Sequence, residues 1–193
     1  MTTLTVVRKN GFVAIAADGL TTFGDMRLPA EYQREQSKLL NIADSWIGVC
    51  GSSAHHLVLG SAFAELGEVA LGSREEVFET FRRLHPVLKE HAYLNPKEDE
   101  DDPYESSQIS CVIANVTGIY AVYSYREVFA FEKFWAAGSG RAYALGAMFA
   151  AYNAQVSAEE IARLGVRAGT EFDTASSGPI VSHAMQIEMN SGT

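Results

Sequence analysis

Residues 4–19 read LTVVRKNGFVAIAADG, the part of the sequence with the strongest hairpin signal. Two runs of β-branched and apolar residues flank Asn10-Gly11, a dipeptide that suits a tight turn because both residues tolerate positive φ. The sequence therefore predicts two antiparallel strands, at residues 4–7 and 12–17. The second strand ends at Asp18, whose carboxylate is costly to bury unless it is paired.

The hydrophobic pattern predicts the elements that follow. Apolar runs bounded by turn residues indicate strands at residues 38–42, 46–50, 109–114, 119–125, 128–131 and 180–188. Apolar residues at three- and four-residue steps indicate helices at 54–69, at 74–91, after Gly140, and after Ser157, which has capping-box spacing to Glu160. Residues 18–36 show little periodicity and are expected to form a long irregular connection.

Strands, two helices, strands, two helices and a strand thus follow one another in blocks. Such segregation favours an α+β protein with antiparallel sheets over an alternating fold with a parallel sheet. We expect a four-layer αββα sandwich, in which two stacked antiparallel sheets lie between two helical layers. The length of 193 residues and the 47% hydrophobic content predict a single domain over residues 1–193 with a full core.

The composition argues against several classes of protein. Charged residues make up only 20% of a chain rich in apolar residues, which excludes a disordered protein. The net charge of −9, without a basic cluster, argues against binding to nucleic acid. No apolar run reaches the ~20 residues of a membrane span, and no export leader is recognisable, so we expect a cytoplasmic protein without a membrane partner. Cys50 and Cys111 lie in apolar stretches and suit reduced thiols.

Thr2 is the first candidate for chemistry. The small side chain at position 2 permits removal of Met1, after which the hydroxyl and a free α-amine share one residue. An α-amine has an ordinary pKa of about 7.7–8.0, so near neutral pH much of it can accept a proton. Nucleophile and base are then both present. A Thr after the initiator methionine is also common in proteins where it has no catalytic role. The prediction that Thr2 is a nucleophile therefore needs support from other residues.

Such features stand at the ends of the expected strands. Lys38 opens a strand, and its charge can meet that of Asp18 at the end of a sheet. Gly51 follows a strand and precedes a helix, so its N–H can donate to an oxyanion. Gly138-Ser139-Gly140 forms a second strand-to-helix turn, and residues 173–178 leave the last helix with a carboxylate and several hydroxyls.

In this order, the features resemble the proteasome β-subunit and HslV family of N-terminal-nucleophile hydrolases, and most narrowly the small bacterial proteasome homologue BPH. The resemblance covers essentially the whole chain. It rests on Thr2-Thr3, Val13-Ala14-Ile15-Ala16-Ala17-Asp18-Gly19, Ser37-Lys38-Leu39, Cys50-Gly51-Ser52-Ser53-Ala54, Gly138-Ser139-Gly140 and Asp173-Thr174-Ala175-Ser176.

The resemblance implies a threonine-type peptidase that needs neither a metal nor an organic cofactor. Thr2 Oγ would attack the scissile carbonyl, with the α-amine of Thr2 as general base. The other expected catalytic residues are Lys38, which holds positive charge beside Thr2, Asp18, which pairs with Lys38, Gly51, whose N–H stabilises the oxyanion, and Ser139, Asp173 and Ser176, which surround the amine. The expected substrate-binding residues are Thr21, Val49 and Ser53.

Two positions depart from the pattern of the family. Asp18 and Lys38 are 38 − 18 = 20 positions apart, a few more than is usual, so the alignment of Lys38 requires an insertion. Ser177 stands between Ser176 and Gly178, where the family more often passes directly from Ser or Thr to Gly.

The resemblance also implies a homo-oligomer of two stacked rings, with seven subunits per ring favoured, that degrades unfolded polypeptides and has an ATP-dependent unfoldase as a partner. The apolar helical face at residues 142–152 exceeds what one domain must bury and fits subunit contacts. Two alternatives remain. One is a catalytically silent ring subunit that serves as a scaffold, and the other is an N-terminal-nucleophile amidase acting on a small molecule.

Two further groups of residues are expected to lie on the surface and not to form metal sites. His55 and His56 are adjacent on a helix, where side chains point about 100° apart, so we expect a helix surface and no metal site. The acidic residues 98–102 lack the spacing of a calcium loop and are expected to form a solvated surface loop.

Overall fold

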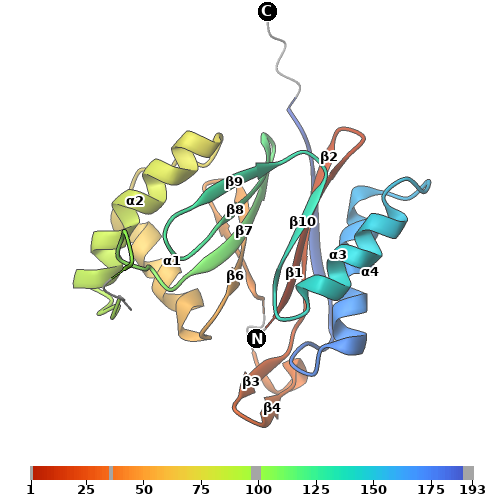
Figure 1. Ribbon diagram of the computed structural model, residues 1–193, viewed down its shortest axis with the longest axis horizontal. Coiled ribbons are helices and arrows are strands. Elements are labelled where there is room, and N and C mark those ends of the chain that lie inside the picture. The colour runs from red at the N-terminus through yellow and green to blue at the C-terminus, as the bar shows by residue number, and fades with distance from the viewer. Residues whose placement is uncertain (1, 35–36, 97–100, 189–193) are drawn as a thin grey trace, which may run out of the picture.

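The computed structural model describes residues 2–34, 37–96 and 101–188. Two antiparallel sheets face each other at the centre of the molecule, and a pair of helices covers the outer face of each sheet (Figure 1). The first sheet has the order β10 (Phe134–Gly138), β1 (Thr3–Lys9), β2 (Phe12–Ala17), β11 (Val181–Gln186). The second has the order β5 (Leu39–Ile42), β6 (Ser45–Cys50), β7 (Ser110–Asn115), β8 (Gly118–Val122), β9 (Val128–Phe131).

The helices are α1 (Ala54–Leu66) and α2 (Arg74–Glu90) on the second sheet, and α3 (Arg141–Ala151) and α4 (Ala158–Phe172) on the first. Three clusters of buried apolar residues separate the four layers. One lies between the two sheets around Leu4 and Val112, one under α1 and α2 around Leu59, and one under α3 and α4 around Met148. The predicted α+β fold, a four-layer αββα sandwich, is confirmed.

Local sequence accounts for the two hairpins that matter most. Asn10 and Gly11 have φ of 51° and 78° and connect β1 to β2 as predicted. Ala43 and Asp44 have φ of 47° and 58° and connect β5 to β6 in the same way. The predicted capping box is also present, because Ser157 accepts a hydrogen bond from the Glu160 N–H at the start of α4.

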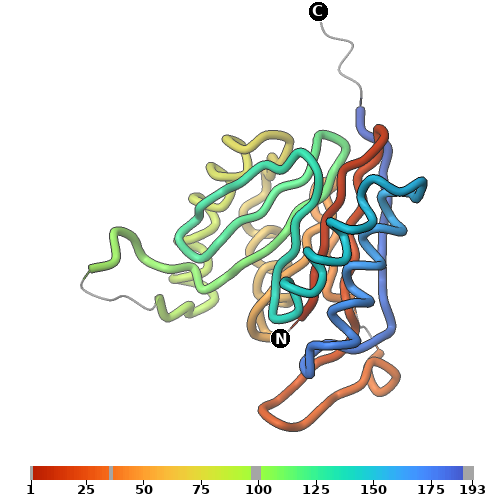
Figure 2. Tube along the Cα trace, turned by 45° about the vertical axis from the view of Figure 1, so that its right-hand side comes forward, coloured from red at the N-terminus to blue at the C-terminus, as the bar shows by residue number. Residues whose placement is uncertain are grey.

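The prediction for residues 18–36 was wrong. Within this stretch lie a short hairpin of β3 (Thr21–Phe23) and β4 (Met26–Leu28) and a 3-10 helix, η1 (Ala30–Tyr32). Three-residue strands are too short to show a periodicity. In Figure 2 this hairpin projects beyond the ends of both sheets, and it pairs with neither of them.

Strand β10 was also missed, because its aromatic and small residues run directly into a glycine-containing turn. It pairs with β1, so the chain passes from the second sheet to the first between β9 and β10. Helix α1 is shorter than predicted and ends at Leu66, because Gly67 has a positive φ of 75°. Residues 98–100 of the predicted acidic loop lie outside the described part of the chain.

Across the residues that the structure describes, no helix combines the length and the apolar character needed to cross a bilayer.

Candidate active site

The open ends of two hairpins bring the candidate residues together. Leu4 pairs with Ala17 across β1 and β2, so the first residue of β1 and the residue just after β2 lie side by side. Thr3 and Asp18 are accordingly bonded through their backbones, with the Asp18 N–H donating to the Thr3 carbonyl at 3.2 Å. In the second sheet, Lys38 lies beside Val49, whose N–H donates to the Lys38 carbonyl at 3.3 Å.

Asp18 and Lys38 form an ion pair in which Nζ lies 2.8 Å from Oδ1. The Asp18 side chain is fully buried, and three backbone N–H groups also donate to its carboxylate, those of Thr3 at 2.9 Å, Leu20 at 3.2 Å and Ser177 at 3.2 Å. These donors compensate for the loss of water around a buried charge. The extra residue Ser177 therefore contributes through its backbone and holds the carboxylate from the side of the last strand.

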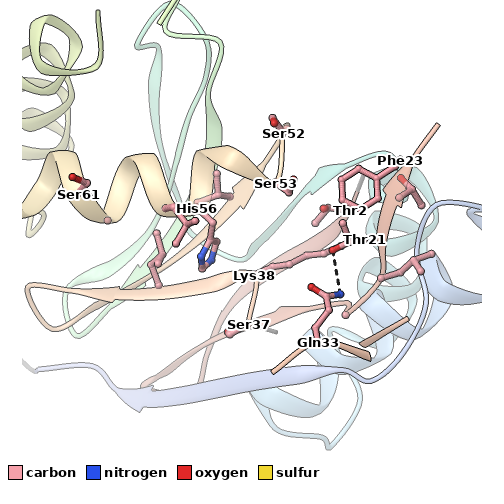
Figure 3. Close-up of a pocket in the computed structure, with 18 residues that line it drawn as sticks. Thr2, Thr21, Phe23, Gln33, Ser37, Lys38, Ser52, Ser53, His56 and Ser61 are labelled. Atoms are coloured by element: carbon pink, nitrogen blue, oxygen red, sulfur yellow. Dashed lines mark hydrogen bonds between the residues drawn. The ribbon is translucent and has the colours of Figure 1, made fainter. Parts of the chain in front are cut away.

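Burial lowers the pKa of Lys38, and the neighbouring Asp18 opposes this effect without cancelling it. The side chain is 15% exposed, so the ammonium lies at the edge of the protein interior and not on the open surface. Figure 3 shows it extending toward Thr2 and Thr21. A positive charge is thus held beside the Thr2 side chain.

A second carboxylate lies near the nitrogen of Thr2. Ser139 Oγ donates to Asp173 Oδ2 at 2.7 Å and accepts from the Thr2 nitrogen at 3.3 Å. Ser176 Oγ donates to the same Asp173 oxygen at 2.7 Å. Burial acts to raise the pKa of Asp173, but hydrogen bonds from Ser139, Ser176 and the Ala175 backbone together contribute to holding the pKa below its usual value. Asp173 is thereby kept ionised.

Two glycines at the site have a positive φ and a close neighbour, which is backbone at Gly138 and a side chain at Gly51. Gly138 has φ of 91°, and a Cβ at this position would lie 2.0 Å from the Thr2 carbonyl oxygen. Gly51 has φ of 124°, and a Cβ there would lie 2.6 Å from His55 Nδ1. Both positions therefore exclude residues with side chains on conformational and steric grounds.

A cavity of about 1120 Å³ opens beside Thr2. Its walls include Thr2, Lys38 and Gly51, and also Thr21, Val49 and Ser53, the three residues expected to bind substrate. Strand β3 and the start of α1 form opposite walls (Figure 3). The same cavity is therefore bordered by the turn at Gly51, by the Thr2 hydroxyl and by the Lys38 ammonium.

The structure thus brings together all the residues predicted for the site, in two groups. Lys38, Gly51 and the three expected substrate-binding residues line the cavity with Thr2, whereas Asp18 lies beneath Lys38. Ser139, Asp173 and Ser176 lie on the other side of Thr2, toward α3 and α4.

Two residues around the site, Thr3 and Gln33, were not predicted from the sequence. Thr3 connects the two groups, and its place after Thr2 was the only sequence signal for it. Gln33 Nε2 donates to Thr21 Oγ1 at 3.5 Å and to the Leu28 carbonyl at 3.4 Å, which ties the β3–β4 hairpin to the segment that leads to Lys38. No sequence pattern indicates this contact, because it depends on the hairpin that the periodicity failed to show.

Cys50 and the neighbouring histidines do not form a competing centre. Burial raises the pKa of Cys50 to about 12, so its thiol is not ionised near neutral pH. Burial also lowers the pKa of His55 and of His56, which favours neutral imidazoles. In the described ranges, no three His, Cys, Asp or Glu side chains are grouped in a way that could hold a metal ion.

Comparison with known proteins gives a consistent picture. BPH from Thiobacillus denitrificans is 44% identical, with a TM-score of 0.91 over 96% of this chain and 98% of that one. A structure of the same protein in complex with epoxomicin matches at 43% identity and a TM-score of 0.91, and the match covers 97% of this chain and 100% of that chain. A eukaryotic HslV from Trypanosoma brucei shares the fold, with 22% identity, a TM-score of 0.72, and coverage of 96% and 99%. No protein-family model and no curated protein sequence matches the chain.

Proposed function

The chain belongs to the family of bacterial proteasome homologues, BPH, and from this premise we propose that it is a threonine-type endopeptidase with Thr2 as its N-terminal nucleophile. One observation carries the proposal. Thr2 lies between the buried Lys38–Asp18 ion pair and the Ser139–Asp173–Ser176 cluster, at the edge of a cavity large enough for substrate side chains.

The proposed reaction requires removal of Met1. The freed α-amine, hydrogen-bonded to Ser139, accepts the proton of the Thr2 hydroxyl while Oγ forms a bond to the scissile carbonyl carbon. Lys38 keeps positive charge beside Thr2, which disfavours protonation of the amine and stabilises the alkoxide as it forms. The Gly51 N–H donates to the carbonyl oxygen as that oxygen becomes negative.

The tetrahedral intermediate then breaks its C–N bond, and the α-ammonium gives its proton to the leaving amine. This leaves the acyl group of the substrate as an ester on Thr2 Oγ. A water molecule attacks the ester, its proton passes to the α-amine, and the C–Oγ bond breaks as the proton returns to Oγ. Atoms and charges balance without a metal or an organic cofactor.

We propose that the substrates are unfolded polypeptides and that the chain works as a homo-oligomer of two stacked rings in the cytoplasm. Large apolar side chains are exposed on the outer helical layer, where Tyr143 is 46%, Phe149 78% and Phe172 65% accessible. Contacts between subunits would cover such residues. Seven subunits per ring and an ATP-dependent unfoldase as partner are proposed from the family resemblance alone.

Intact-mass spectrometry of the purified oligomer tests the proposal. We expect a mass that lacks Met1 and, after incubation with epoxomicin, a stoichiometric adduct that peptide mapping places on Thr2. Thr2→Ala should abolish adduct formation and casein hydrolysis and leave the oligomer intact, because the hydroxyl acts chemically. A fully active enzyme that retains Met1, or a Thr2→Ala variant as active as the wild type, would contradict the mechanism.

A further inference from the structure

Thr3 occupies a position between the two polar groups of the site. Its side chain is fully buried, and its N–H donates to Asp18 Oδ1 at 2.9 Å. Its hydroxyl lies 2.7 Å from Ser176 Oγ. The residue next to the nucleophile is therefore bonded to one carboxylate through its backbone and, through Ser176, to the other carboxylate through its side chain.

The fold leaves room for this hydroxyl. A Cβ at Gly140 would lie 2.0 Å from Thr3 Oγ1, and a Cβ at Gly169 would lie 2.3 Å from the same atom. These glycines stand at the N-cap of α3 and inside α4, so both helices approach β1 closely at this point. Neither position has a positive φ, and close packing against Thr3 explains their lack of a side chain.

The direction of the hydrogen bonds among Thr3, Ser176 and Asp173 follows from the number of hydroxyl protons that these residues carry. Asp173 is ionised and can only accept, so the single hydroxyl proton of Ser176 points to Asp173 Oδ2. The hydroxyl proton of Thr3 must then point to Ser176 Oγ. On the other side, Ser139 donates to Asp173 and accepts from the nitrogen of Thr2.

We propose that Thr3 is a positioning residue, whose hydroxyl polarises Ser176 and thereby sets how much of the Asp173 negative charge reaches the α-amine of Thr2. This inference rests on the proposed function. Hydrogen bonds in a chain strengthen one another in a buried environment. A donor on Ser176 makes Ser176 a better donor to Asp173, which disperses the carboxylate charge and stabilises the Thr2 ammonium less.

The variant Thr3→Val tests this directly, because valine keeps the shape of threonine and removes the donor. We expect kcat at neutral pH to fall about two- to fourfold, because the loss of one donor weakens the next charge-assisted hydrogen bond by only about 10–30%. KM should stay within about twofold, since Thr3 does not line the cavity. The acidic limb of kcat/KM should move to higher pH, because a less dispersed Asp173 charge raises the pKa of the α-amine.

Thr3→Ser keeps the hydroxyl and should restore both kcat and the acidic limb to near wild-type values. In a Ser176→Ala background, Thr3→Val should have little further effect, because the bond through which it acts is already absent. A merely structural residue would lower the yield or the melting temperature and leave the acidic limb in place.

The experiment uses the assembled enzyme and a fluorogenic peptide that the wild type cleaves, with Thr2→Ala measured in parallel. If Thr2→Ala cleaves as fast as the wild type, the proposed function is wrong. If cleavage depends on Thr2 but Thr3→Val keeps the wild-type kcat and pH profile, or adds its full effect to that of Ser176→Ala, the role of Thr3 is wrong. If the Thr3→Val variant fails to assemble, Thr3→Cys is tested in its place, because a thiol is only a weak hydrogen-bond donor. An acidic limb of kcat/KM at the wild-type pH in Thr3→Cys would equally overturn the inference.

Discussion

Lys38 Nζ lies 2.8 Å from Asp18 Oδ1, across 20 residues of sequence that include a hairpin and a 3-10 helix. The two partners differ in their surroundings. The Asp18 side chain is fully buried and also accepts hydrogen bonds from three backbone N–H groups, whereas the Lys38 side chain is 15% exposed and the Asp18 charge is the main interaction that opposes the effect of burial on its pKa. Loss of either partner should therefore affect catalysis alike but stability differently.

We expect Asp18→Asn to destabilise the fold by about 3 kcal/mol, because it leaves a largely buried ammonium without its counter-ion and turns an amide toward N–H donors. Lys38→Met should cost only about 1–2 kcal/mol, since the remaining donors still bind the Asp18 carboxylate. Both variants should lose at least about a hundredfold in kcat/KM. Denaturant unfolding and peptide hydrolysis measure the two effects.

Lys133→Met is the matched control, because Lys133 is exposed and does not line the cavity, and its activity should equal that of the wild type. An active Lys38→Met variant would show that the positive charge beside Thr2 has another source.

The pH dependence of activity should reflect the burial of Lys38. Burial lowers the pKa of Lys38 from the ordinary value near 10.5, so its ammonium loses a proton at a lower pH than the ammonium of a surface lysine does. Activity that needs the charge is then lost as the pH rises through this lowered pKa. We expect the alkaline limb of kcat/KM to have its midpoint below pH 10.5.

Lys38→Arg should remove this limb, because a guanidinium stays charged throughout the range, although kcat itself should fall with the changed geometry. A limb at the same pH in Lys38→Arg would assign the titration to another group.

The sequence was sufficient to predict the layers of the fold and the β1–β2 hairpin, because long periodic segments and an Asn-Gly turn depend on local chemistry. It was insufficient for β3, β4 and β10. These strands are short, and β10 is defined by its pairing with β1, from which it is separated by more than 120 residues. The site residues could be named because the features at the ends of the expected strands and helices, taken in order, resemble those of a known family. Thr3 could not, because a threonine in a strand looks like an ordinary β-former until its buried hydroxyl is seen to meet Ser176.

The acid stability of the protein should depend on Glu105. Hydrogen bonds from Lys89 and His85 lower the pKa of Glu105 to about 2. Because this pKa is depressed on folding, the interaction stabilises the native state above the ordinary pKa near 4.5 and is lost as the pH falls toward 2. Glu105→Gln should therefore be less stable than the wild type at pH 6, and the difference should shrink steadily between about pH 4.5 and pH 2.

Urea unfolding at a series of pH values measures this difference, with the exposed Glu171→Gln on α4 as the matched control. A stability difference for Glu105→Gln that is independent of pH would mean that the bonds from Lys89 and His85 do not form in solution.

Glycine-to-alanine substitutions should distinguish a glycine that contacts the backbone of Thr2 from a glycine that only adds flexibility to a helix. At Gly138, alanine meets both a positive φ of 91° and a Thr2 carbonyl oxygen 2.0 Å from its Cβ, so β10 must move away from Thr2. We expect Gly138→Ala to lose more than about 2 kcal/mol of stability and nearly all hydrolysis. Gly146 lies on the side of α3 that is exposed in the single subunit, where an added Cβ would meet no atom within 4 Å, and in the separated subunit Gly146→Ala should gain about 0.5–1 kcal/mol through reduced chain entropy. Thermal unfolding and peptide hydrolysis of the two variants decide the matter: equal effects at both glycines would mean that the contact between Gly138 and Thr2 does not constrain the site.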